Sequence, residues 1–124
     1  MKIVLIYDTH TKHYELNDMS EYSDCQMIIH AGDISSKGRS YEVNDFYDWY
    51  SGLSFEYKIF IPGNHDFNFE NTDNLPNHIQ NIRNNIPKGI TYLNNDSIEI
   101  EGIKIYGSPV TVMKRIGYYR NYKV

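Results

Sequence analysis

The stretch Met27-Ile28-Ile29-His30-Ala31-Gly32-Asp33 decides the fold, because a short apolar run ends there at a glycine followed by a carboxylate. A similar arrangement occurs once before it and once after it. Residues 3–7 lead into Asp8-Thr9-His10, and residues 57–61 lead into Pro62 and Gly63-Asn64-His65-Asp66. Continuous apolar, β-branched runs such as residues 3–7 are typical of strands buried on both faces. We therefore expect three successive buried strands, each followed by a polar loop.

Two segments with a helical spacing of apolar residues separate the later strands. Ser40 can cap the first helix and Gly52 can end it, and its apolar positions are Val43, Phe46, Tyr47 and Tyr50. The second helix, which Pro87 and Gly89 terminate, is indicated by Leu75, Ile79, Ile82 and Ile86. Between the first two strands, the polar sequence allows at most a short helix around residues 14–21.

After the second helix, the apolar period changes from that of a helix to that of a strand. Residues 97–100 and 103–106 flank Glu101-Gly102, a two-residue turn with glycine in second place, which predicts a β-hairpin. The expected order is β-(α)-β-α-β-α-β-β-β. Strands that alternate with helices indicate an α/β fold with a parallel sheet, whose sites lie beyond the carboxyl ends of the strands. Asp8, Asp33 and Asn64 all occupy such positions.

Length and composition are those of one folded domain. The chain has 124 residues, of which 40% are hydrophobic and 23% are charged, and this is enough for a core of its own. No run approaches the ~18 apolar residues of a membrane span. Asp8 interrupts the first apolar run, and no small-residue cleavage site follows. We therefore expect a cytoplasmic protein that does not associate with membranes.

Charge and cysteine content argue against a general nucleic-acid-binding protein and against a disulfide-stabilised protein. The formal net charge is −4 and no basic tract is present, so general nucleic-acid binding is not expected. Cys25 is the single cysteine, which rules out an internal disulfide and fits a reducing compartment. Because Cys25 begins an apolar stretch, we interpret it as a buried core thiol rather than a nucleophile.

The three polar loops carry the donors of a hard-cation site. Asp8 and His10 are two residues apart, so one bend can direct both at a single ion. The glycine before Asp33 permits a sharp turn and leaves this carboxylate able to bridge two metals. Asn64 supplies an amide oxygen, and His65 can hydrogen-bond a phosphate oxygen or a leaving group. This mixture suits Mn, Fe, Zn or Co, and two such ions about 3.5–4 Å apart would clamp a phosphate for in-line displacement.

Other polar residues have plainer interpretations. Any one of the loop residues alone could cap a strand end, but as a set they favour a metal site. His30 is interpreted as a residue that supports the ligands or packs beneath them rather than a ligand. Asp66 is expected to orient its loop. We expect His13 to be an exposed loop histidine and His78 to lie on the solvated side of its helix.

The motifs Asp-x-His, Gly-Asp and Gly-Asn-His-Asp, in this order, resemble the first three motifs of the calcineurin-like metallophosphoesterases. The likeness covers roughly residues 2–109 and includes Ile105-Tyr106-Gly107-Ser108-Pro109. It is similar in particular to the metallophosphoesterase-domain-containing branch, which is active on cyclic nucleotides where tested. The resemblance implies the N-terminal half of an α/β/β/α sandwich, with a mixed sheet that starts βαβαβ and ends in the hairpin. Residues 1–109 would form this domain, and residues 110–124 a C-terminal tail.

The resemblance also implies a role for each site residue. Asp8, His10 and Asp33 would bind one metal, Asp33 and Asn64 would bind the other, and His65 would act on a small phosphate ester or phosphodiester. The family completes this site with histidine-containing segments further downstream. The five histidines of this chain are His10, His13, His30, His65 and His78. The nominal two divalent metals could therefore be reduced to one here.

Three hypotheses follow. The chain is a weak, single-metal phosphoesterase, or a non-catalytic remnant that only binds, or the amino-terminal product of a split gene. In the last case, a separate C-terminal fragment would complete the site. One face of the sheet would lack its partner sheet, and such an apolar surface favours self-association.

Overall fold

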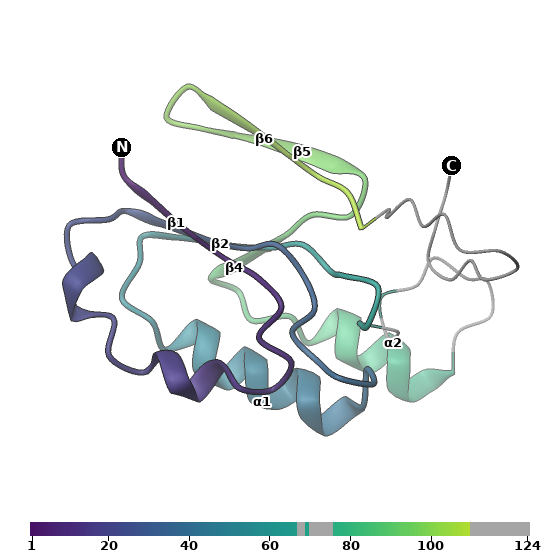
Figure 1. Cartoon of the computed structure of the whole chain (residues 1–124). Helices are drawn as coiled ribbons and strands as arrows, with labels where there is room; N and C mark the ends of the chain where they lie inside the picture. Colours follow the sequence, from purple (N-terminus) through teal and green to yellow (C-terminus); the bar gives the residue numbers. More distant parts are fainter. Residues whose placement is uncertain (67–68, 70–75, 110–124) are drawn as a thin grey trace, which may run out of the picture.

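The computed structural model describes residues 1–66, 69 and 76–109, and the strands in them form two separate sheets (Figure 1). Four parallel strands lie in the order β1-β2-β3-β4. Two antiparallel strands, β5 and β6, form a hairpin of their own. The bounds are Ile3–Ile6 for β1, Met27–His30 for β2, Tyr57–Phe60 for β3, Ile90–Tyr92 for β4, Asp96–Ile100 for β5 and Ile103–Gly107 for β6.

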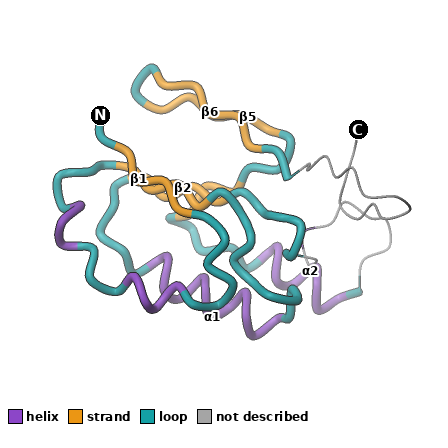
Figure 2. The backbone as a smooth tube through the Cα atoms, in the orientation of Figure 1, coloured by secondary structure: helices purple, strands orange, loops and turns teal. Residues whose placement is uncertain are grey.

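All the described helices lie on one face of the parallel sheet, and the hairpin lies on the other (Figure 2). They are the α-helices α1 (Ser40–Ser51) and α2 (Asn77–Asn84) and the short 3₁₀ helices η1 (His13–Leu16) and η2 (Ser20–Tyr22). The layers are therefore helices, parallel sheet and hairpin. No described helix is long and apolar enough to cross a membrane.

The larger core lies between the sheet and the helices. Phe46 and Tyr50 of α1 are fully buried and stack on each other, with ring centroids 4.8 Å apart. The Tyr50 hydroxyl lies within hydrogen-bonding distance of two strand carbonyls, those of Ile28 (3.1 Å) and Ile59 (2.6 Å). These contacts fix α1 across β2 and β3.

The smaller core lies between the sheet and the hairpin. Met27, Ile59, Leu93 and Ile100 are its buried members. The hairpin turn has positive φ at both Glu101 (49°) and Gly102 (82°), as a type I′ turn requires. The sequence prediction of a hairpin at this turn is therefore confirmed.

The alternating order of strands and helices is confirmed, but the predicted mixed sheet is wrong for the described residues. The four-stranded sheet is entirely parallel, because β5 and β6 pair with each other rather than with its edge. The hairpin contacts the sheet through apolar side chains on its face instead.

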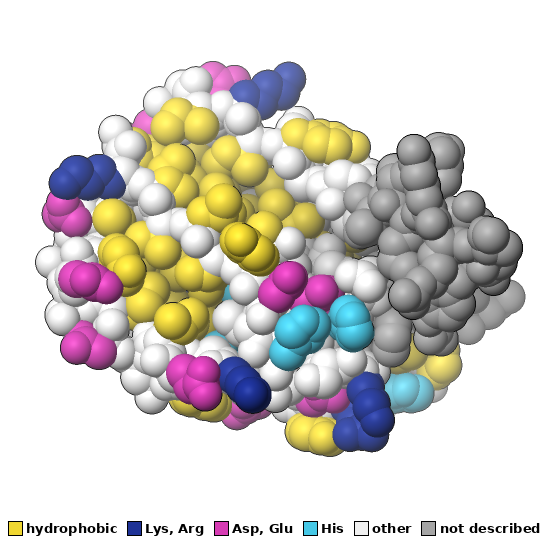
Figure 3. All heavy atoms as spheres, in the orientation of Figure 1, with side chains coloured by type: hydrophobic (Ala, Val, Ile, Leu, Met, Phe, Trp, Pro, Cys, Tyr) yellow, Lys and Arg dark blue, Asp and Glu magenta, His cyan; other side chains and the backbone are white. Residues whose placement is uncertain are grey.

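The prediction that residues 3–7 are buried on both faces is also wrong. β1 is an edge strand, and two apolar side chains on its outer face, Ile3 (39%) and Leu5 (59%), are exposed, as is Tyr7 (64%) directly after it. Figure 3 shows a broad area of hydrophobic side chains on this side of the molecule. Only Val4 and Ile6 pack against the helix-side core.

The ends of the helices differ in detail from the prediction. Arg39, not Ser40, precedes the first turn of α1, and the Glu42 carboxylate accepts hydrogen bonds from the backbone N–H groups of Ser36 (2.7 Å) and Arg39 (3.4 Å). Gly52 ends α1 as predicted. The short helix expected around residues 14–21 is two 3₁₀ turns. Leu75 and the predicted tail at 110–124 lie outside the described residues.

Candidate metal centre

The candidate centre is built from the loops that follow β1, β2 and β3. Backbone hydrogen bonds attach the first loop to the second: Asp8 N–H donates to Gly32 O (2.9 Å) and His10 N–H to Asp33 O (3.0 Å). Thr11 N–H continues this series to Ile34 O (2.9 Å). The two loops therefore form one unit, and the side chains of Asp8, His10 and Asp33 are held relative to one another.

This unit contains backbone strain. Asp8 (φ 54°), His10 (44°), Thr11 (70°) and Asp33 (57°) all have left-handed conformations, which are uncommon for residues other than glycine. Such residues each cost of order 1–3 kcal/mol and concentrate at functional sites. The cross-loop hydrogen bonds offset this cost, and three of the four residues, Asp8, His10 and Asp33, are ones that the sequence predicts as metal ligands.

Two glycines allow the second and third loops to touch. A Cβ atom on Gly63 would lie 2.2 Å from Asp33 Oδ1, and a Cβ atom on Gly32 would lie 2.8 Å from Gly63 Cα. Gly32 also has φ +112°. With this close approach, Asp33 Oδ1 accepts a hydrogen bond from the backbone N–H of His65 (2.9 Å).

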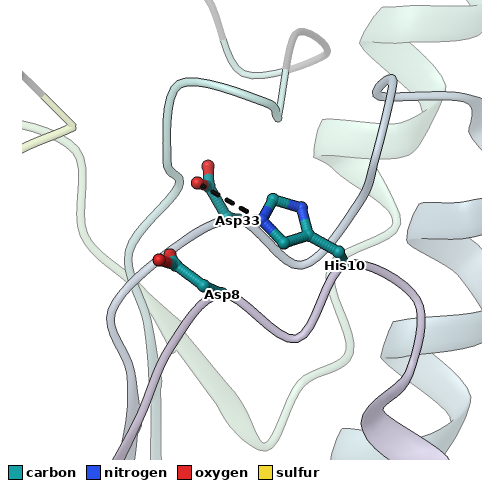
Figure 4. Close-up of side chains that lie close together, drawn as sticks. All are labelled: Asp8, His10 and Asp33. Atoms are coloured by element: carbon teal, nitrogen blue, oxygen red, sulfur yellow. Dashed lines mark ion pairs between the residues drawn. The ribbon is translucent and has the colours of Figure 1, made fainter.

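Asp8, His10 and Asp33 form a compact donor cluster (Figure 4). Each offers one ligand atom, and these atoms lie within 4.8 Å of one another. Burial and the neighbouring Asp33 carboxylate raise the pKa of Asp8. Asp33 is buried, His10 is half-buried and Asp8 is exposed, so the cluster opens to solvent at one side.

The chemistry of this cluster fits a divalent cation. His10 Nδ1 lies 3.0 Å from the carbonyl of Ser35, which can only accept, so Nδ1 carries the proton. In the neutral ring, Nε2 then directs a lone pair towards Asp33 Oδ2, 3.9 Å away. Two acceptors that face each other repel, and a cation between them removes the repulsion.

His65 lies against the cluster without belonging to it. Its ring is perpendicular to that of His10, with centroids 4.9 Å apart. His65 Nδ1 lies 3.0 Å from the carbonyl of Ser36 and must therefore donate to it. This bond orients the ring, and proton transfer at His65 would use Nε2 rather than Nδ1. The sequence interpretation of His65 as a residue that acts on phosphate is compatible with this placement.

His30 lies beneath the loops, fully buried. Its Nδ1 accepts from Gly32 N–H (3.2 Å), and its Nε2 lies 2.9 Å from Thr9 Oγ1. It therefore links the first two loops from below. Burial lowers the pKa of His30 to about 3, so its ring is neutral at ordinary pH. It is not among the clustered donors.

Asp66 joins the third loop to the second. Its buried carboxylate accepts hydrogen bonds from the backbone N–H groups of Ile34 (3.2 Å), Ser35 (3.0 Å) and Gly63 (2.8 Å), and from Ser35 Oγ (2.8 Å). Burial raises the pKa of Asp66, and these hydrogen bonds oppose that shift. The placement is that of a residue that orients its loop.

Some remaining predictions need correction. His13 is fully buried, not exposed, because its ring packs against Trp49 and Tyr14 while Nε2 lies 3.1 Å from Asp45 Oδ2. Cys25 is only half-buried, because it lies just before β2 rather than inside it. His78 is exposed on α2, as predicted.

Asn64 is half-buried between Gly63 and His65, and its assignment as a ligand stays a prediction. Ser35, Ser36 and Thr9 were missed as positioning residues. The only sequence signal for them is a run of small hydroxyl residues next to the predicted ligands, a pattern that loops also show without any site.

Comparison with protein families and individual relatives identifies the lineage. The profile of the calcineurin-like phosphoesterases matches residues 1–122. This chain belongs to that family. The resemblance of its three motifs is thereby confirmed, and the observed parallel sheet, helices and hairpin are compatible with the α/β fold expected for this calcineurin-like phosphoesterase.

Individual relatives support the same family assignment. The human metallophosphoesterase domain-containing protein 1 is 30% identical over 125 residues, which are 87% of this chain and 37% of the relative. A UPF0046 protein of Caenorhabditis elegans is 27% identical over 133 residues, 98% of this chain and 43% of the relative. The calcineurin-like phosphoesterase chain thus spans less than half the length of these relatives.

Proposed function

We propose that this chain is a divalent-metal-dependent phosphoesterase that hydrolyses small phosphate mono- or diesters. The observation that carries this proposal is the cluster of Asp8, His10 and Asp33, whose ligand atoms lie within 4.8 Å of one another. Membership of the calcineurin-like phosphoesterases supports it. The substrate and the activity are inferred, since the curated relatives are more than twice as long as the matched region.

Asp8, His10 and Asp33 would hold the first cation, and Asp33 and Asn64 would contribute to a second. Mn, Fe, Zn and Co all suit carboxylate, imidazole and amide donors. When bound, such a cation neutralises charge on the phosphate and polarises water. No histidine follows His78 in the sequence, so we propose one well-held metal per chain and a second that needs donors from elsewhere.

His65 would act as the general acid. The Ser36 carbonyl fixes its Nδ1–H, so a protonated ring can present Nε2–H to the leaving-group oxygen of the ester. General acid catalysis of this kind contributes about 10²–10⁴-fold. The backbone N–H of His65 is bound to Asp33, which ties the position of the acid to the position of a metal ligand.

Metal binding and turnover, measured together, test this proposal. Calorimetric titration with MnCl₂ should give about one tight site per chain, and hydrolysis of para-nitrophenyl phosphate or its bis ester should require the metal. Asp33→Asn should abolish both. His65→Ala should retain the metal, because the backbone N–H that holds Asp33 remains in the variant, but lower kcat by about 10²–10⁴-fold.

His78→Ala is the matched control, since His78 is exposed on α2, and it should change neither quantity. Tight manganese binding without hydrolysis of either ester would replace the proposal with the binding-only alternative. Two tight sites per chain would contradict the single-metal form of it.

A further inference from the structure

A cavity of about 430 Å³ lies next to the metal cluster, at the amino-terminal end of α1. Thr11 and Ser36 line it. Thr11 directly follows His10, and the Ser36 carbonyl accepts the hydrogen bond from His65 Nδ1. The cavity therefore shares a wall with the candidate site. A substrate whose phosphate lies at the cluster can place its organic part there.

The two acidic residues in the cavity wall are already engaged by the protein. Glu42 is 4% exposed, and its carboxylate accepts from the backbone N–H groups of Ser36 and Arg39. Asp45 has one oxygen 3.1 Å from His13 Nε2 and the other 2.9 Å from the Tyr14 hydroxyl. Both carboxylates thus accept hydrogen bonds from groups of the chain itself, which stabilise their negative charge.

The two basic residues in the wall are available to a ligand. Lys37 is exposed and makes no hydrogen bond or ion pair with any described residue. Arg39 is exposed too, and within the described part of the chain its guanidinium donates only to the Tyr41 hydroxyl, from Nη1 (3.1 Å). A guanidinium has five N–H donors, so most of them face solvent.

The first turn of α1 adds to this positive potential. The helix is 12 residues long and begins at Ser40, directly after Arg39. Its amino-terminal N–H groups carry partial positive charge. In Figure 3, some of the Lys and Arg side chains lie below a group of acidic and histidine side chains, and others lie at the top and upper left of the view. The cavity thus combines two cations with a helix terminus, beside a candidate phosphate site.

We propose that this cavity binds a second anionic group of the substrate, through Lys37 and Arg39. The preferred substrates are then phosphate esters whose organic part carries a further phosphate or a carboxylate. The part of this inference that concerns turnover rests on the proposed phosphoesterase function. The part that concerns anion binding does not.

Anion binding is tested without catalysis, by titrating inorganic phosphate into the ¹⁵N-labelled chain after the metal has been removed with EDTA and the EDTA has been removed by desalting. The metal-free carboxylates of Asp8 and Asp33 repel phosphate, so binding reports on the cavity. Amide shifts should concentrate at residues 36–42, and Lys37→Ala/Arg39→Ala should weaken binding at least about fivefold at low salt. The charge-matched control, Lys88→Ala/Lys104→Ala, alters two exposed lysines on other elements and should bind as the wild type does. Shifts that are absent, or unchanged in the first double variant, would overturn the proposal.

Turnover tests the substrate preference. With manganese bound, kcat/KM for para-carboxyphenyl phosphate should exceed that for phenyl phosphate at least about tenfold, and this ratio should collapse in Lys37→Ala/Arg39→Ala. Raising NaCl from about 20 mM to about 300 mM should also lower the ratio. A wild-type ratio near one would refute the preference. If neither ester is hydrolysed, the proposed function fails instead, and the phosphate titration alone decides whether the cavity binds anions.

Discussion

The two faces of the parallel sheet carry similar apolar side chains but are covered very differently. On the helix face, Val4 packs against a core in which Ile28 and Phe60 are fully buried. On the opposite face, the hairpin buries Met27 and Ile59 of the inner strands. It leaves the corresponding side chains of the edge strand β1 exposed, with Leu5 at 59%.

This difference shows that an apolar run in the sequence predicts a strand but not whether both of its faces are buried. Residues 3–7 are as apolar as a strand buried on both faces, so the local sequence cannot distinguish an edge strand from an inner one. Whether a face of the strand is buried depends on helices and strands that lie far away in the sequence. In the described residues, α1 and α2 cover one face, while the hairpin covers only part of the other. The faces should therefore respond differently to the same kind of substitution.

The largest effect is expected on the helix face. Phe46 is fully buried, and its ring contacts those of His30, Tyr50 and Phe60, with centroids 5.2, 4.8 and 5.4 Å away. Phe46→Ala removes these contacts and leaves a cavity, so the free energy of unfolding should fall by about 3–5 kcal/mol in urea denaturation. A loss below about 1 kcal/mol would mean that this face is not the stabilising core.

A pH-dependent effect should come from the same face. In the folded chain, burial lowers the pKa of His30 from the ordinary 6.5 to about 3. Between these two values the unfolded chain binds the extra proton and the folded chain does not. Stability from this group is therefore complete above pH 6.5 and is lost as the pH falls towards 3, by up to about 1.4 kcal/mol per pH unit.

The difference between wild type and His30→Gln isolates this contribution. Denaturation of both at a series of pH values should give a shallower slope for His30→Gln. His78→Gln, altered at an exposed position on α2, should keep the wild-type slope. Burial lowers the pKa of His13 as well, so part of the acid sensitivity should remain in His30→Gln. Equal slopes for wild type and His30→Gln would contradict the prediction.

Tyr50 should give a smaller effect on the helix face. Its buried hydroxyl approaches the carbonyls of Ile28 and Ile59. Tyr50→Phe leaves these carbonyls without that donor and should cost about 1–2 kcal/mol in the free energy of unfolding. Tyr41 is 65% exposed, so Tyr41→Phe is the matched control and should change stability by less than about 0.5 kcal/mol. Similar losses in the two variants would show that the Tyr50 hydroxyl is not a specific contact.

Local signals predict the parts of this molecule that depend on neighbours in sequence. Three features are predictable in this way: the Glu101-Gly102 turn, the apolar positions of α1 and the polar loops that follow three strands. The grouping of Asp8, His10 and Asp33 follows from topology, because parallel strands bring their carboxyl ends to one edge. The prediction of the metal site therefore rested mainly on the carboxylate, imidazole and amide side chains in these loops and on the order of their motifs.

Features that depend on long-range contacts were not predictable. Nothing local marks Asp8, His10 and Thr11 for left-handed φ, since cross-loop hydrogen bonds impose it. The burial of His13 depends on Trp49 of α1. The position of β1 at the edge of the sheet depends on the strand order β1-β2-β3-β4, and the exposure of its outer face depends on where the hairpin lies. Each of these is set by residues distant in sequence.

The smallest effect is expected on the uncovered part of the opposite face. Leu5→Ser should change the free energy of unfolding by less than about 0.5 kcal/mol, since the side chain is already 59% exposed. Urea denaturation measures this, with Phe46→Ala as the contrasting variant. Binding of a hydrophobic dye should decrease in Leu5→Ser, because the substitution removes part of the apolar area around Ile3 and Tyr7. A loss of about 2 kcal/mol or more would mean that another copy of the chain, or residues outside the described ranges, covers β1 in solution. Repeating the denaturation at several protein concentrations separates these two cases, because only association between copies makes the loss depend on concentration.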